Sequence, residues 1–115
     1  KPEDAASAVE SGRLAKGVPI EVPGSWQMQG HGTPHYTNVQ MPFAFDPPQI
    51  PADNATAVYC RSFTVPASWK NQRIVLEFGG ADSVLAVYVD GVAVGFSKDS
   101  RLPAEFEITP LVKPG

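Results

Sequence analysis

Carboxylates are the most numerous residues in this chain that could take part in catalysis. Hydrolysis of a glycosidic bond needs two of them flanking that bond, roughly 5–10 Å apart. Among the 12 Asp and Glu residues, Glu77 and Glu107 fall on the outer faces of predicted strands, and Asp82 and Asp90 fall in predicted turns. Charged side chains at such positions are usually solvated. The sequence therefore singles out no catalytic pair.

Histidines could bind a metal ion. His31 and His35 are four residues apart, a spacing that would place both on one face of a helix. Gly30, Gly32 and Pro34 surround them, however, and these residues do not favour a helix. No third ligand is near in sequence, and neither a nucleophile elbow nor a phosphate-binding loop is present. We predict no metal site and no catalytic residue in this chain.

A segment rich in Pro and Gly carries Trp26, Tyr36 and Asn38. An aromatic ring packs on the apolar face of a pyranose, and an amide can donate to one hydroxyl and accept from another. The same residues also have a simpler interpretation, in which Trp26 and Tyr36 anchor an irregular loop to the core. Residue chemistry alone favours that second interpretation.

A second segment, residues 95–106, contains charged side chains between two predicted strands. Asp99, Arg101 and Glu105 could form charge-assisted hydrogen bonds that fix a tight connection. Here the structural role is the one we predict.

The elements that position these residues are short strands. The 12 Pro and 10 Gly residues argue against long helices, and only residues 3–14 could form one. Proline dominates residues 41–51, which predicts a long irregular loop or an edge excursion. Aromatic and β-branched content predicts a strand at 58–65, and apolar patterning predicts strands at 73–78, 84–89, 92–96 and 105–109.

Within these strands the pattern makes finer predictions. Residues 84–89 are apolar on both faces, which suits a central strand. The pair Asp90-Gly91 predicts a type I′ hairpin turn. Four strand aromatics are expected to face inward, namely Phe78, Tyr88, Phe96 and Phe106. The fold class is therefore all-β, a β-sandwich.

Composition excludes several classes of partner. A chain of 115 residues with a net charge of −3 and no basic run gives no electrostatic signal for nucleic acid or an anionic membrane. Cys60 is the only cysteine, so no intrachain disulfide can form, and we interpret it as a small strand residue. No apolar run approaches the roughly 20 residues that span a bilayer.

Two stretches carry a resemblance to a known family. Residues 22–30 (Val-Pro-Gly-Ser-Trp-Gln-Met-Gln-Gly) and 36–39 (Tyr-Thr-Asn-Val) resemble the start of the large bacterial β-galactosidases of glycoside hydrolase family 2. Residues 94–106 (Val-Gly-Phe-Ser-Lys-Asp-Ser-Arg-Leu-Pro-Ala-Glu-Phe) are similar to the same domain further along. We therefore divide the chain into a poorly matched segment, 1–17, and a jelly-roll domain, 18–115.

The resemblance implies a fold and a division of labour. The fold is a jelly-roll β-sandwich of the galactose-binding type, a fragment with strands missing at one or both ends. In that family the catalytic glutamates and the Mg²⁺ site belong to a TIM barrel absent from this chain. We therefore expect Mg²⁺ and Na⁺ in the parent enzyme, no cofactor in this fragment, and no activity from the fragment alone. Asn38 matches the family residue that contacts galactose, so it is the predicted substrate-binding residue.

The expected partners are a galactoside, bound through the parent enzyme, and the catalytic TIM barrel. Missing strands would leave open sheet edges, so we also expect self-association of the fragment. The alternative function is a free-standing carbohydrate-binding module, and a pure packing domain is a third reading. The sequence leaves the cellular compartment open.

Overall fold

The computed structural model describes most of the chain, namely residues 2–12, 16–34, 38, 46, 48–49, 51 and 54–115. The chain divides into two compact units. Unit 1 comprises Lys1–Ala8 and Arg13–Val58, and unit 2 comprises Val9–Gly12 and Tyr59–Gly115. The predicted loop at 41–51 lies largely outside the described residues.

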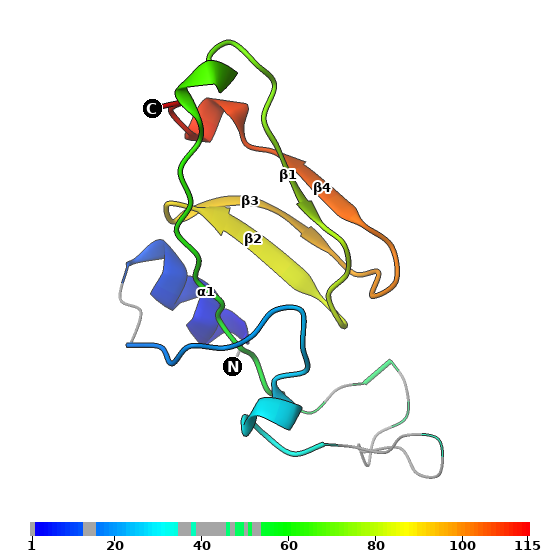
Figure 1. Cartoon of the computed structure of the whole chain (residues 1–115). Coiled ribbons are helices and arrows are strands. Elements are labelled where there is room, and N and C mark those ends of the chain that lie inside the picture. Colours follow the sequence, from blue (N-terminus) through cyan, green and yellow to red (C-terminus); the bar gives the residue numbers. More distant parts are fainter. Residues whose placement is uncertain are drawn as a thin grey trace. The chain divides into compact units, whose positions relative to one another are not determined.

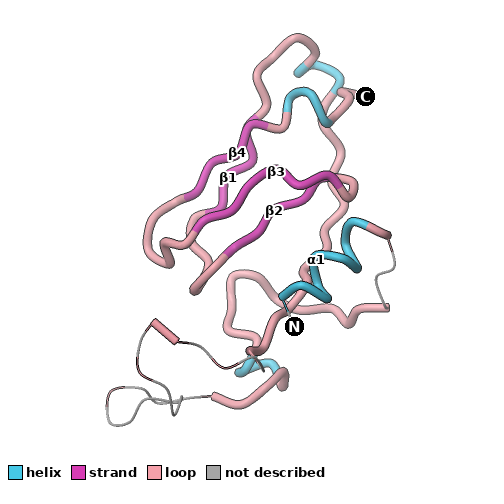
Figure 2. Tube along the Cα trace, turned by 180° about the vertical axis from the view of Figure 1, so that it is seen from behind, coloured by secondary structure: helices cyan, strands magenta, loops and turns pink. Residues whose placement is uncertain are grey.

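Unit 2 contains the strands, which form two antiparallel ladders. The strands are β1 (Val75–Phe78), β2 (Leu85–Val89), β3 (Val92–Ser97) and β4 (Ala104–Glu107). In the described part of the chain β1 pairs with β4 and β2 pairs with β3, as Figures 1 and 2 show. Four of the five predicted strands are therefore present, with boundaries moved by one or two residues.

Strand β1 confirms the strand predicted at 73–78. Ile74 is buried and Leu76 packs against the core, whereas Arg73 and Glu77 are exposed. Opposite β1, the register pairs Val75 with Glu107 on β4. The alternating pattern thus places one apolar face inward and one polar face toward solvent.

The β2–β3 hairpin confirms the predicted turn and corrects the predicted strand position. Asp90 and Gly91 have φ angles of 48° and 81°, as a type I′ turn requires. The prediction that 84–89 is a central strand is wrong, because among the described residues β2 pairs with β3 alone. Its inward side chains Val87 and Val89 are buried while Ala86 is exposed. A small apolar residue such as Ala86 is tolerated in water, so apolarity on both faces did not require burial of both.

The prediction of a strand at residues 58–65 is wrong. Residues 58–65 adopt no strand, and Tyr59 and Phe63 are each about half exposed. Aromatic and β-branched residues favour strands only where a partner supplies a ladder and a packing surface, and no described segment pairs with this one. The interpretation of Cys60 as a small strand residue fails for the same reason, and Cys60 is exposed.

The core of unit 2 lies between the two ladders. It contains Val65, Ile74, Val89 and Ile108, with Ile108 only 1% exposed. The ladders meet where Gly95 of β3 faces the ring of Phe106 on β4. Two packed antiparallel sheets with an apolar interior are a β-sandwich arrangement.

The aromatic side chains only partly follow the prediction that they face inward. Phe78 and Phe106 are half-buried and form an edge-to-face pair, with ring centroids 6.1 Å apart and planes at 77°. Tyr88 is also half-buried. Phe96 is 65% exposed, so the prediction is wrong for this residue. Its register partner is Ala86, which is too small to cover the ring.

Helices contribute little to the fold. The predicted helix is α1 (Pro2–Glu10), with Glu3 and Asp4 in its first turn, where negative charge is favourable. Three short 3₁₀ turns complete the secondary structure: η1 (Gln27–Gln29), η2 (Ala67–Trp69) and η3 (Thr109–Leu111). Among the described residues, no helix has the length and apolarity that crossing a bilayer requires.

Candidate functional site

The predicted substrate residue, Asn38, lies in a turn of unit 1 and is exposed. Trp26 belongs to the same unit, directly precedes η1 and is half-buried. Tyr36 and His35 lie outside the described residues. The structure thus places Asn38 at an exposed position of unit 1 and gives the geometry of the turn that begins this segment.

That turn, residues 21–31, is closed by main-chain hydrogen bonds. The carbonyl oxygen of Trp26 accepts from the N–H groups of Gln29 and His31, each at 3.0 Å. The N–H of Gly30 donates to the carbonyl oxygen of Gln27 at 3.3 Å, with Gly30 in the left-handed region at φ 89°. A glycine at position 30 suits the end of η1, because only glycine adopts this φ without steric cost.

Side-chain amides complete the turn, and sequence reasoning did not find them. The Oε1 of Gln29 accepts from the N–H of Glu21 at 2.8 Å, and its Nε2 donates to the carbonyl oxygen of Glu21 at 3.0 Å. The hydroxyl of Ser25 donates to Oε1 of Gln27 at 2.7 Å. Glutamine has no sequence signature for such bonds, since any main-chain group within reach can serve as its partner.

The connection between β3 and β4 is held mainly by Asp99. Its Oδ1 accepts from the N–H groups of Arg101 at 2.9 Å and Leu102 at 3.2 Å, which confirms its predicted structural role. The Ser100 hydroxyl adds a bond of 2.7 Å to Asp82. The side chains of Arg101 and Glu105 make no hydrogen bond within the described part of the chain, so the prediction is wrong for these two.

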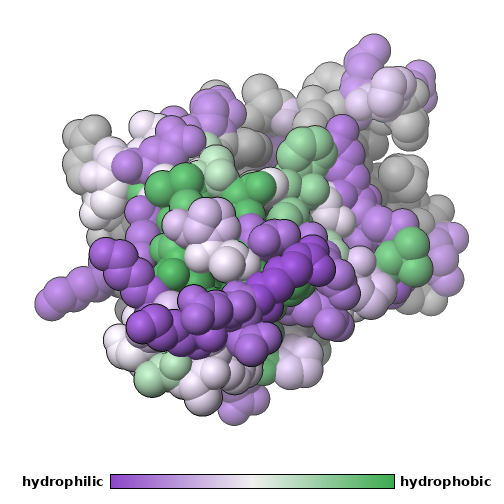
Figure 3. Space-filling model, turned by 90° about the horizontal axis from the view of Figure 1, so that it is seen from above, coloured by the Kyte–Doolittle hydropathy of each residue, from purple (hydrophilic) through white to green (hydrophobic). Residues whose placement is uncertain are grey.

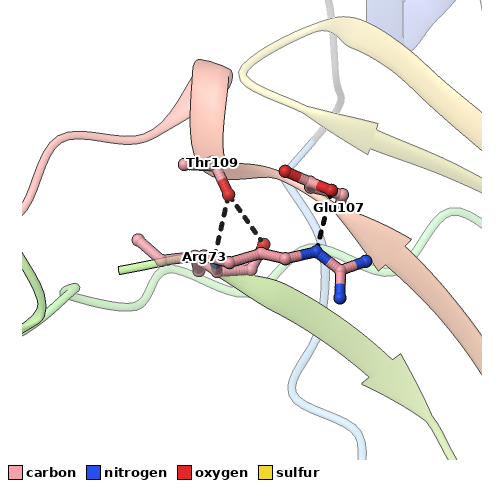
Figure 4. Close-up of polar contacts among 4 residues, drawn as sticks. Arg73, Glu107 and Thr109 are labelled. Atoms are coloured by element: carbon pink, nitrogen blue, oxygen red, sulfur yellow. Dashed lines mark hydrogen bonds and ion pairs between the residues drawn. The ribbon is translucent and has the colours of Figure 1, made fainter. Parts of the chain in front are cut away.

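The remaining polar cluster surrounds the start of β1 (Figure 4). The Nε of Arg73 donates to a carboxylate oxygen of Glu107 at 2.9 Å, and the Thr109 hydroxyl accepts from the N–H of Ile74 at 2.8 Å. The hydrogen bond from Arg73 lowers the pKa of Glu107, and the same bond raises the pKa of Arg73. An open hollow of about 470 Å³ lies beside them, and its wall includes Lys70. Both ends of the ion pair are largely exposed, so this cluster closes a sheet and lacks the buried carboxylate pair of a hydrolase.

The described His, Cys, Asp and Glu side chains form no group of three or more that could hold a metal ion, and His31 is exposed. The Mg²⁺ and Na⁺ of the parent enzyme stay an expectation that the family resemblance implies.

Two packed antiparallel ladders define the class of β-sandwich domains. The model of the family described as "Glycosyl hydrolases family 2, sugar binding domain" matches residues 1–115, and the chain belongs to this family. The predicted fold, an all-β jelly-roll sandwich, is confirmed by this family together with the observed ladders.

Curated relatives of this chain are β-galactosidases. A β-galactosidase of Psychromonas ingrahamii is 49% identical over 90 residues, which make up 78% of this chain and 9% of that protein. A β-galactosidase of Vibrio cholerae is 47% identical over 96 residues, covering 84% of this chain and 9% of that protein. The chain thus spans about a tenth of the length of the curated relatives it matches.

Solved structures also show similarity. A β-glucuronidase from Ruminococcus gnavus in complex with D-glucaro 1,5-lactone is 34% identical in sequence, with a TM-score of 0.45. The match covers 46% of this chain and 9% of that chain.

Proposed function

We propose that this chain is the non-catalytic N-terminal domain of a β-galactosidase that hydrolyses terminal β-D-galactosides. The observation that carries this proposal is its 49% and 47% identity to two curated β-galactosidases over most of its length. Catalytic residues, Mg²⁺ and Na⁺ then belong to the longer enzyme. The partner of this domain is the TIM barrel, and the domain proper comprises residues 18–115.

Asn38 lends a hydrogen-bonding group to the galactose pocket of that enzyme. Two observations support this role: Asn38 is exposed, and it lies in a turn. Its amide can both donate and accept, as a sugar hydroxyl requires. A group of this kind fixes the orientation of a sugar hydroxyl without taking part in proton transfer. Its loss should therefore impair substrate positioning and leave the catalytic groups intact.

The test is Asn38→Ala in the full-length enzyme. A hydrogen bond to a substrate hydroxyl contributes roughly 1–3 kcal/mol, so kcat/KM for a galactoside should fall about 5- to 150-fold. Asn54→Ala is the matched control, because Asn54 belongs to the same unit and, within the described part of the chain, bonds through its main-chain oxygen, which accepts from the Thr56 hydroxyl. Equal kcat/KM for Asn38→Ala and the control would remove Asn38 from the pocket.

One observation favours a second candidate, a free-standing carbohydrate-binding module. Phe96 exposes its ring on β3, with the Lys98 ammonium 5.5 Å from the ring centroid. An open aromatic face is the surface on which a pyranose packs. A ¹⁵N–¹H correlation spectrum titrated with galactose separates the two functions. Saturating shifts at Phe96 and Lys98 would establish the module, and unshifted, well-dispersed peaks favour the accessory domain.

A further inference from the structure

We propose that Gln29 is a positioning residue for the Asn38 contact and acts through the turn at residues 21–31. This inference rests on the proposed function, since it assigns the means by which the domain presents Asn38. Gln29 itself touches no substrate in this proposal.

The first support is the pair of bonds that Gln29 makes. Its amide binds both polar groups of the Glu21 main chain, accepting from the N–H at 2.8 Å and donating to the carbonyl oxygen at 3.0 Å. Two bonds to one residue fix orientation as well as distance, as a strand partner does within a sheet. Residues 21 and 29 are thereby held together across the base of the turn.

The second support is that this turn has no apolar core of its own. The described part of unit 1 contains no buried residue, and Val22 and Met28 are among the most exposed apolar side chains of the chain. Hydrogen bonds therefore determine the shape of the turn. The hydrogen bonds to the Trp26 carbonyl oxygen close η1 and do not reach beyond it. The Gln29 amide joins η1 to the extended segment at Glu21.

The third support comes from Gly24, which lies inside the same turn. A Cβ at position 24 would be 2.8 Å from Nε2 of Gln29 and 3.0 Å from the carbonyl oxygen of Glu21. Contacts this short are not tolerated without movement of one group. Gly24 does not have a positive φ, so the space it leaves for the Gln29 amide is the physical reason for glycine here.

The connection to Asn38 is made along the chain. Asn38 is nine positions after Gln29, and both belong to unit 1. In this proposal the two bonds between Gln29 and Glu21, called the clamp below, orient the chain where it leaves the turn at residue 31, ahead of Asn38. Misplacement of a positioning group by about 1 Å can cost up to about 100-fold in rate. Both bonds are solvent-exposed, so their effect on folding should be small by comparison.

The experiment is a double-mutant cycle in the full-length enzyme, with kcat and KM measured for a galactoside. Gln29→Ala should lower kcat/KM on the order of 10-fold, and the loss should vanish in an Asn38→Ala background. Gln27→Ala is the matched control and should stay near wild type, since within the described part of the chain its amide accepts from the Ser25 hydroxyl two residues away and does not reach Glu21. Thermal unfolding of each variant measures the structural contribution separately.

A second pair of variants tests the clamp without removing Gln29. Gly24→Ala should displace the amide and lower kcat/KM as Gln29→Ala does, and it should add little to Gln29→Ala. A loss in Gln29→Ala that persists in the Asn38→Ala background would overturn the proposal, because Gln29 would then act on something else. So would a wild-type kcat/KM in Gln29→Ala. If Asn38→Ala is itself neutral, the proposed substrate contact fails; if only Gln29→Ala is neutral, this inference alone fails.

Discussion

The ion pair between Arg73 and Glu107 joins the two strands of one ladder at their ends. Arg73 precedes β1, and Glu107 is the last residue of β4. Thr109 strengthens the same end by bonding to both main-chain groups of Ile74, accepting from its N–H at 2.8 Å and donating to its carbonyl oxygen at 3.4 Å. Exposed charge pairs of this kind contribute little to stability individually. Their titration is nevertheless measurable, because the pKa of Glu107 differs between the folded and unfolded chain.

Glu107 makes stability fall at acidic pH. Its pKa in the folded chain is lowered, chiefly by the Arg73 hydrogen bond, so the unfolded chain binds more protons as the pH falls. The stabilisation is complete above the ordinary Glu pKa of about 4.3. It is lost as the pH falls through the lower folded value. Arg73 has a raised pKa and stays charged throughout this range.

Urea unfolding of the isolated chain between pH 6 and pH 3 (roughly the range spanning the Glu pKa) checks this. Wild type should lose more stability than Glu107→Gln, which has no carboxylate to titrate. Glu77→Gln is the control, since Glu77 is exposed on the same ladder and, within the described part of the chain, forms no ion pair. Its stability should decline with pH as wild type does. A Glu107→Gln profile parallel to wild type would show that the pair contributes nothing.

At the scale of single residues, the sequence predicted local hydrogen bonds better than distant ones. Asn38 was predicted as a contact residue from its motif; it is exposed, and its role stays a prediction. Gln29 was missed because its partner is a main-chain group eight residues away. Asp99 was predicted because its bonds to Arg101 and Leu102 are local, two and three residues along the chain. Short-range side-chain bonds have a sequence signature, and long-range ones do not.

At the scale of elements, the predictions succeeded where the pattern was local. Strand β1 and the turn at Asp90-Gly91 depend on alternation and on residues that accept positive φ. The segment 58–65 has the composition of a strand but no described partner, and a ladder partner cannot be inferred from one segment alone. Phe96 was misplaced for a related reason, since its exposure depends on the size of Ala86 across the hairpin.

The contact between the two ladders gives a prediction at this scale. A Cβ on Gly95 would lie 2.8 Å from Cε1 and 3.0 Å from Cδ1 of Phe106. Gly95→Ala should therefore push the ladders apart and lower the free energy of unfolding by about 1–3 kcal/mol. Gly79→Ala is the control, because a Cβ there meets nothing within 4 Å and φ is not positive; it should change stability by less than about 0.5 kcal/mol. Equal urea midpoints for the two variants would contradict the packing described here.

For the whole molecule, the decisive feature is how little of its apolar surface is covered. The buried apolar residues of the described chain are Val65, Ile74, Val87, Val89 and Ile108. Several large apolar side chains of unit 2 are about half exposed or more, namely Tyr59, Phe63, Trp69, Phe96 and Leu102. Figure 3 shows apolar side chains reaching the surface between polar ones. Exposed apolar surface on this scale indicates an interaction partner or a tendency to associate.

We therefore expect the isolated chain to associate with itself. Each described strand has one unpaired edge, and unpaired N–H and C=O groups pair readily with another chain. Light scattering over a wide range of concentration should show a mass that rises above the 12.3 kDa of one chain. Phe63→Thr removes a half-exposed ring, so it should reduce association, whereas Thr64→Ser in the same segment should not. A mass of 12.3 kDa at every concentration would contradict this prediction, because it would show that the open strand edges do not pair between copies.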